Sequence, residues 1–258
     1  MTILLSAVSP AVSAAGLFSP ALSAPVKSAA DTLPLERGTW FDAPEIKDGL
    51  ARATFETLAM VGISTVIASA LGLILGMILV ATGRGGLLPS PLLNKTLGFI
   101  VNVGRAIPFI IFVFILIGFS RAIAGTGSAW QGFTVPLTIS AAFYFARLVE
   151  SNLMGVERGK VEAVLMMGAS RTRIMFGVLM REALPALVQS VTILAVTLVG
   201  YSAMAGAVGG GGLGAMAQNA GYYNNRPDVL TIVVVVLVLL VMVIQALGDM
   251  LSRLVDHR

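Results

Sequence analysis

Apolar residues gather in five long runs that are separated by short polar segments. A helix needs about 20 such residues to cross the hydrocarbon core of a bilayer. The runs cover 58–81, 97–119, 133–149, 187–208 and 230–247. The second contains one charge, Arg105, and the third is the shortest and has Arg147 inside its end, where an arginine can reach the interface at modest cost. The pattern predicts an all-α polytopic membrane protein with five transmembrane helices.

Basic residues concentrate in alternate connections between the runs. Arg84 and Lys95 lie between the first and second runs, whereas the intervening connections hold only Arg121 and Arg226. Six more basic residues lie in or after the third run, and two close the chain: Arg147, Arg158, Lys160, Arg171, Arg173 and Arg181, then Arg253 and Arg258. Loops retained in the cytoplasm collect Lys and Arg. We therefore expect an N-terminus outside and a C-terminus in the cytoplasm.

The first 49 residues are rich in Ala, Ser and Pro and contain five prolines that oppose a long helix. We expect a mostly disordered tail over 1–49 and a single transmembrane domain over 50–258. Two alternatives stay open. Leu22-Ser23-Ala24 resembles a signal-peptide cleavage site, although no basic residue precedes Lys27, and a start codon assigned too far upstream would also produce such a tail.

Composition places the chain in a membrane and removes several kinds of chemistry. Hydrophobic residues make up 57% and charged residues 12%, with a mean hydropathy of +0.91. The sequence has no cysteine, and His257 is its one histidine. Disulfides, thiolate or histidine metal sites, cysteine catalysis and histidine triads are thereby excluded. The net charge is +4, and the basic residues lie mainly in the connections between the runs. This distribution indicates topology and is not typical of a nucleic-acid-binding surface. We expect no metal, cofactor or nucleic acid on this chain.

The segment over 158–185 is amphipathic and carries both signs of charge. Four residues share one helix face: Val161, Val164, Leu165 and Gly168. Glu162 lies on the other face, Gly168 can end this helix, and Ser170 can cap the next one. A charged helical hairpin among membrane spans is typical of a docking surface for a soluble partner. The alternative is an interfacial amphipathic helix or an ordinary cytoplasmic helical hairpin that binds nothing.

This segment resembles the EAA loop of ATP-binding-cassette importer permeases, on the order Glu162-Ala163, Gly168 and Leu184-Pro185. A wider likeness covers residue 50 to the C-terminus. The stretch VGYSAMAGAVGGGGLG over 199–214 resembles the fourth span of the methionine-importer permeases. Four shorter stretches resemble that family in the same order: residues 56–60, 105–111, 135–138 and 146–150. Val164 and Arg181 depart from the general pattern, and the second departure leaves Pro185 as the helix breaker of the segment.

The resemblance implies the type I ABC importer permease fold, with a cytoplasmic coupling helix. It implies a homodimer of this chain with the translocation path at its axis, in the inner membrane of a bacterium. Two cytoplasmic ATPase subunits would bind ATP and Mg, and an external substrate-binding protein, often a lipoprotein, would deliver methionine or a related amino acid. Five residues would couple the chain to the ATPase: Glu162, Ala163, Gly168, Leu184 and Pro185. The chain itself would be a transport subunit and not an enzyme.

Residues inside the runs give weaker candidates. Tyr201, Ser202 and Met204 lie in the middle of the fourth run beside small residues, so we expect them to line the substrate path, with core packing as the alternative. Arg105 is a candidate intramembrane functional charge. Its alternative is a structural residue near Pro108 that pairs with Glu150 or Glu182.

Glycines at two places predict packing and turns. Gly209, Gly211 and Gly214 match G-x-G-x-x-G, but no strand precedes them and no G-K-[ST] follows, which argues against a nucleotide site. An irregular turn or a close helix approach is the expected role. Gly72 and Gly76 predict close helix packing in the first run.

Two other classes of function remain as alternatives. A secondary transporter needs coupling carboxylates at mid-membrane, and the centres of the five runs contain none. An intramembrane enzyme needs paired Asp, a Ser/His couple or a metal cluster, which the residue inventory does not supply. Within the importer class, the substrate stays open among L-methionine, D-methionine, their oxidised or selenium analogues and other small amino acids.

Overall fold

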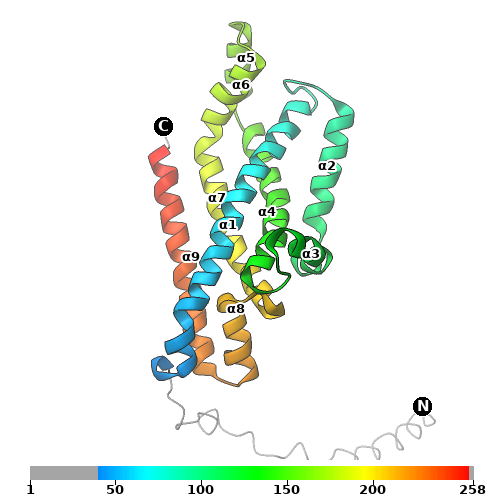
Figure 1. Ribbon diagram of the computed structural model, residues 1–258. Coiled ribbons are helices and arrows are strands. Elements are labelled where there is room, and N and C mark those ends of the chain that lie inside the picture. Colours follow the sequence, from blue (N-terminus) through cyan, green and yellow to red (C-terminus); the bar gives the residue numbers. More distant parts are fainter. Residues whose placement is uncertain (1–39, 256–258) are drawn as a thin grey trace, which may run out of the picture. The chain divides into compact units, whose positions relative to one another are not determined.

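The computed structural model describes residues 40–255, and every regular element in that range is helical (Figure 1). Within residues 40–255, four helices are long and apolar enough to cross a membrane. They are α1 (Pro44–Thr82), α4 (Ala129–Met154), α7 (Met180–Ala205) with its flanking turns, and α9 (Pro227–Val255). A fifth span is obtained when the bent pair α2 (Pro91–Ala106) and α3 (Phe109–Ala124) is counted as one. The five predicted runs therefore all fall on these helices.

The second predicted span is not one straight helix. Its two halves, α2 and α3, are bent by 108°. Ile107, between them, has an extended backbone with ψ at 122°, because the proline that follows disfavours helical geometry in the residue before it. Pro108 also has no N–H to continue the helix. Pro108 thus marks a break at which the chain turns sideways.

The first helix begins earlier than the predicted boundary at residue 50. A short 3-10 turn, η3 (Trp40–Asp42), leads into α1 at Pro44, where proline fits because the first helical turn has no N–H partner. Residues 1–39, most of the predicted tail, lie outside the described residues. The tail boundary at 49 was therefore wrong for its last ten residues, because Ala43 and Ile46 are buried in an apolar cluster with Val229 of α9.

Charged groups also connect the start of α1 to the start of α9. The Arg226 guanidinium donates to Asp228 Oδ2 at 2.9 Å and pairs with Glu45 of α1 at 3.3 Å. The backbone N–H of Trp40 donates to Asp228 Oδ2 at 3.1 Å. These contacts join the start of α1 to the start of α9.

Helix α4 lies at the centre of the bundle, and α1 packs along it. Gly72 and Gly76 of α1 face Phe145 and Val149 of α4. A Cβ at Gly76 would lie 2.6 Å from the Val149 side chain, so only glycine permits this approach. The predicted packing role of the two glycines is confirmed.

Several connections lie at two opposite ends of the bundle, whereas α3 lies between these ends (Figure 1). At one end, α4 leads into α5 (Arg158–Met166), α6 (Arg171–Ile174) and the π-helical turn η4 (Met175–Leu179), from which α7 runs back. The end of α1, the start of α2 and the end of α9 lie toward this α5–α6 end. The α8 end, opposite, holds α8 (Gly212–Met216) and the starts of α1 and α9.

The glycine-rich stretch breaks the fourth span before α8. The π-helical turn η5 (Gly206–Gly210) follows α7, and η6 (Ala217–Tyr223) follows α8. Gly209, Gly211 and Gly212 have φ of 98°, 73° and 71°, a region that favours glycine. The predicted irregular turn is confirmed, and the regular part of this span ends at Ala205, before the predicted end at residue 208.

Candidate docking and coupling site

Gly168 and Ser170 form the turn between α5 and α6. Gly168 has φ of 76°, and its N–H donates to the carbonyl of Leu165 at 3.0 Å, which is a left-handed helix ending. Ser170 precedes α6, and its Oγ accepts the N–H of Arg173 at 3.4 Å. Both features were predicted, and both are confirmed. They fix the direction in which α6 leaves α5.

Apolar side chains lie uncovered on this hairpin. Met166 and Met167 are 87% and 76% exposed, and Leu165 is exposed beside them. Glu162 and Ala163 are exposed too, whereas Val161 packs against the core. Adaptable methionines next to a carboxylate form a surface suited to a protein partner.

The base of the hairpin is held to the fourth span. Lys160 of α5 forms an ion pair with Glu182 of α7. Leu184 is 40% exposed, and the carbonyl of Pro185 accepts the Ser252 hydroxyl of α9 at 3.3 Å. Pro185 does not break the helix as expected: α7 runs through it, because Ala183 and Leu187 on either side are buried in the core. The two residues thus lie within a span, beside the hairpin.

A cavity of about 860 Å³ opens between the hairpin, the end of α4 and the connection from α1 to α2. Charges of both signs line it: Arg84, Glu150, Arg158, Glu162 and Arg171. Glu162 therefore faces a space bordered by arginines.

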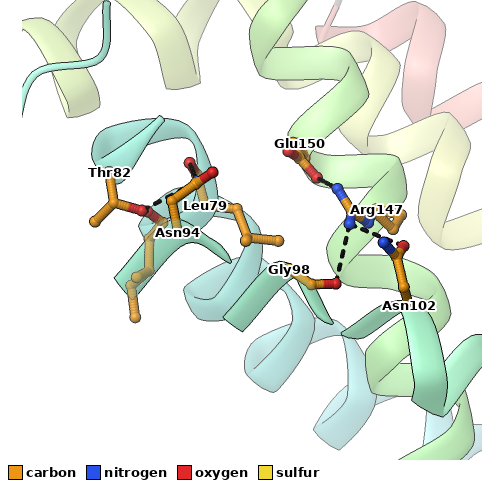
Figure 2. Close-up of polar contacts among 8 residues, drawn as sticks. Leu79, Thr82, Asn94, Gly98, Asn102, Arg147 and Glu150 are labelled. Carbon is orange, nitrogen blue, oxygen red and sulfur yellow. Dashed lines mark hydrogen bonds and ion pairs between the residues drawn. The ribbon is translucent and has the colours of Figure 1, made fainter. Parts of the chain in front are cut away.

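Arg147 of α4 joins this region to α2 (Figure 2). Its guanidinium donates to the carbonyl of Gly98 at 3.2 Å and to Asn102 Oδ1 at 2.8 Å, and it forms an ion pair with Glu150. The sequence marked Arg147 as a charge inside a span without indicating its partners. Glu150 is thus paired with Arg147 rather than with Arg105, which is exposed at the end of α2.

Asn94 makes a second connection to α2, one that the sequence analysis missed. Its Nδ2 donates to the carbonyl of Leu79 at 2.8 Å and to Thr82 Oγ1 at 3.3 Å (Figure 2). The last turn of a helix has unpaired carbonyls, and Asn94 satisfies one of them in α1. The available signal was an amide side chain shortly after Pro91, at the start of an apolar helix. Together, Asn94 and Arg147 tie α2 to both α1 and α4.

The three path candidates occupy different surroundings. Tyr201 stacks on Phe109, with ring centroids 4.9 Å apart and planes at 5°. Ser202 is buried and donates to the carbonyl of Val199 at 2.7 Å. Met204 is 44% exposed. Their role in the path stays a prediction. Of the three, Met204 is the best candidate, because its side chain is accessible.

A family model described as the binding-protein-dependent transport system inner membrane component matches residues 68–258. The chain belongs to this family. Its fold is the importer permease fold expected from the sequence, and it is a multi-pass membrane protein.

Two relatives show how far the likeness within this family extends. A Vibrio cholerae protein named "Probable D-methionine transport system permease protein MetI" is 47% identical over 211 residues, which are 82% of this chain and 94% of that protein. The "Methionine import system permease protein MetP" of Bacillus subtilis is 39% identical over 209 residues, which are 81% of this chain and 94% of that protein.

Two solved structures agree with this fold. A chain of the MetNI methionine ABC transporter in an inward-facing conformation superposes with a TM-score of 0.81 at 42% identity, covering 83% of this chain and all (100%) of that chain. A crystal structure of an amino acid ABC transporter with histidines superposes with a TM-score of 0.66 at 16% identity, which concerns the fold alone.

Proposed function

We propose that this chain is the permease subunit of an ATP-driven importer of methionine. The observation that carries the proposal is the 42% identity to a MetNI methionine transporter chain over that chain's whole length, together with an exposed hairpin at one end of the bundle. Relatives from two bacterial species are named for methionine transport, which supports the same substrate class.

The assembly would consist of two copies of this chain and two ATPase subunits, which bind ATP and Mg. The ATPases would dock at the α5–α6 end, where Met166, Met167 and Glu162 are exposed. Loops on that side are basic, which supports its assignment to the cytoplasm and that of the C-terminus with it. The N-terminus and the α8 end would face outward and receive the substrate-binding protein.

Coupling would follow from the contacts of the hairpin. Closure of the ATPases pushes the docked α5 helices together. The ion pair between Lys160 and Glu182 joins α5 to α7, so α7 moves with α5. Arg147 joins α4 to α2, so α2 moves with α4. The spans then change from an inward-facing to an outward-facing arrangement, and ATP binding shifts the equilibrium between these two states. The chain acts by changing conformation and performs no covalent chemistry.

Uptake by vesicles reconstituted with the permease and its ATPase tests this function. Radiolabelled L- and D-methionine should enter only with ATP inside and loaded binding protein outside. Uptake driven by an ion gradient without ATP would instead show a secondary transporter. Titration of the binding protein with a panel of small amino acids shows whether methionine or another compound is the substrate.

A further inference from the structure

Two neighbouring side chains of α1 hold the first residues of α8. Glu56 Oε2 accepts the N–H of Gly212 at 2.8 Å, and Thr57 Oγ1 accepts the N–H of Leu213 at 2.9 Å. The first N–H groups of a helix have no partner within it, so a distant segment caps α8 here. The carboxylate contact is charge-assisted and therefore the stronger of the two.

Both contacts are sheltered. Thr57 is 1% exposed, and the Glu56 side chain is 15% exposed. Arg52, one turn before Glu56, donates to Glu56 Oε1 at 3.0 Å and thereby leaves Oε2 directed at Gly212. This arrangement places a charged acceptor and a neutral one side by side against the break in the fourth span.

The glycines of the break permit this approach. A Cβ on Gly211 would lie 2.7 Å from Glu56 Oε2, and one on Gly212 would lie 2.6 Å from Thr57 Oγ1. Both have positive φ, at 73° and 71°. The glycine-rich sequence is therefore matched to two specific acceptors on α1 and does more than allow a turn.

We propose that Glu56 and Thr57 are positioning residues that latch α8 to α1 until the transporter turns outward, when α8 separates from α1. This role rests on the proposed function, because release of the latch matters only in an alternating transporter. The latch consists of two hydrogen bonds and no covalent link, so the displacement of the spans can break it. With the latch open, the face between α1 and α8 becomes accessible from outside.

The test uses a single cysteine in this cysteine-free chain, placed at Ala53. Ala53 is buried on α1 in the cluster that contains Leu213. The full-length permease, assembled with its ATPase in vesicles without added amino acid, is treated with a small aqueous thiol reagent. Thr57→Val keeps the shape and removes the acceptor. We expect labelling to become roughly fivefold faster, the ratio that corresponds to about 1 kcal/mol, the net value of one hydrogen bond.

Two variants control for other causes, and a third repeats the test at the other acceptor. Thr57→Ser keeps the hydroxyl and should label at the parental rate. Thr65→Val removes, from the same helix, a buried hydroxyl that has no hydrogen-bond partner among the described residues, and it should also leave labelling unchanged. Glu56→Ala removes the other acceptor and should increase labelling as Thr57→Val does, which provides the readout if the buried substitution is not recovered in the membrane.

Parental labelling rates in both Thr57→Val and Glu56→Ala would overturn the latch. An equal increase in Thr65→Val would do the same, because it would show general loosening. Labelling needs no substrate, so these results leave the methionine assignment to the uptake measurement. If methionine uptake fails while the variants label as expected, the proposed function is contradicted and the latch is not.

Discussion

Lys160 of α5 and Glu182 of α7 form an ion pair that closes the base of the α5–α6 hairpin. Both side chains are partly exposed, so the pair contributes less than about 1 kcal/mol to stability. Its main effect is geometric, since it joins α5 to α7 at the base of the hairpin.

Charge reversal tests this contact. Lys160→Glu and Glu182→Lys should each lower ATP-dependent uptake several-fold without reducing the amount of permease in the membrane, because like charges would push α5 away from α7. The double variant should regain part of the uptake. Lys47→Glu, in the exposed pair with Asp42 near the α8 end, is the matched control and should transport normally. No recovery in the double variant would show that the pair is incidental.

Glu162→Ala and Gly168→Val should uncouple the permease from its ATPase. Truncating one partner of a desolvated charge pair across an interface costs about 2 to 5 kcal/mol. A Cβ at Gly168 has open space, so the cost of valine there, about 1 kcal/mol or more, comes from its positive φ. Uptake and binding of the ATPase should both fall in reconstituted vesicles.

The controls for this pair use neighbouring positions. Gly168→Asn tolerates the left-handed conformation and should retain most uptake. Glu157→Ala removes an exposed carboxylate just before α5 and should have little effect. Normal ATP-dependent uptake by both Glu162→Ala and Gly168→Val would show that the hairpin is not the coupling element.

Arg226→Met should destabilise the α8 end. Arg226 and Asp228 are 4% and 5% exposed, and the hydrogen bond with Asp228 raises the pKa of Arg226 against the effect of burial, so the guanidinium stays charged. Removing it strands a buried carboxylate at a cost of about 3 to 5 kcal/mol. The midpoint temperature of thermal unfolding in detergent should fall clearly in Arg226→Met. Arg121→Met, at an exposed arginine, should change this temperature little. Equal shifts would contradict the buried network.

Reporter fusions test the orientation. Fusions that end at Arg121 or Arg226 should report the outside, and fusions at Arg84, Arg171 or Arg258 the cytoplasm, because the latter group lies in the basic connections. A reporter signal from outside at Arg171 would contradict both the five-span topology and the proposed docking role of the hairpin.

Cysteines at positions 202 and 204 test the substrate path. Met204→Cys should be labelled by an aqueous thiol reagent at a rate that depends on the nucleotide state, since the native side chain is 44% exposed. Ser202→Cys should be labelled slowly in the state described here, because Ser202 is buried. Protection of both positions in every nucleotide state would exclude this face of α7 from the path.

Local patterns in the sequence predicted local structure well. The turn at Gly168, the cap at Ser170 and the irregular turn near Gly209 each depend on residues within a few positions, so composition and spacing were sufficient. The packing of Gly72 against α4 was also expected, because small residues four apart have few other uses in a membrane helix.

Contacts between distant segments could not be predicted in the same way. Arg147 reaches Asn102, and Glu56 reaches Gly212, only because the bundle brings α4 to α2 and α1 to α8. No spacing rule identifies such partners. The start of α1 was missed for a related reason, since residues 40–49 look polar and irregular until Glu45 and the Trp40 N–H meet the charges before and within α9.

Helix α1 is 39 residues long, which at 1.5 Å per residue gives about 58 Å, roughly twice the hydrocarbon thickness. Its one proline is Pro44, at the first helical position, so no kink is built into its length. Near one end, Glu56 holds α8, and at the other the carbonyl of Leu79 accepts a hydrogen bond from Asn94 of α2. We therefore expect α1 to tilt as one part, so that a displacement at one face of the membrane moves the end of the helix at the other face without a relay of side chains between them.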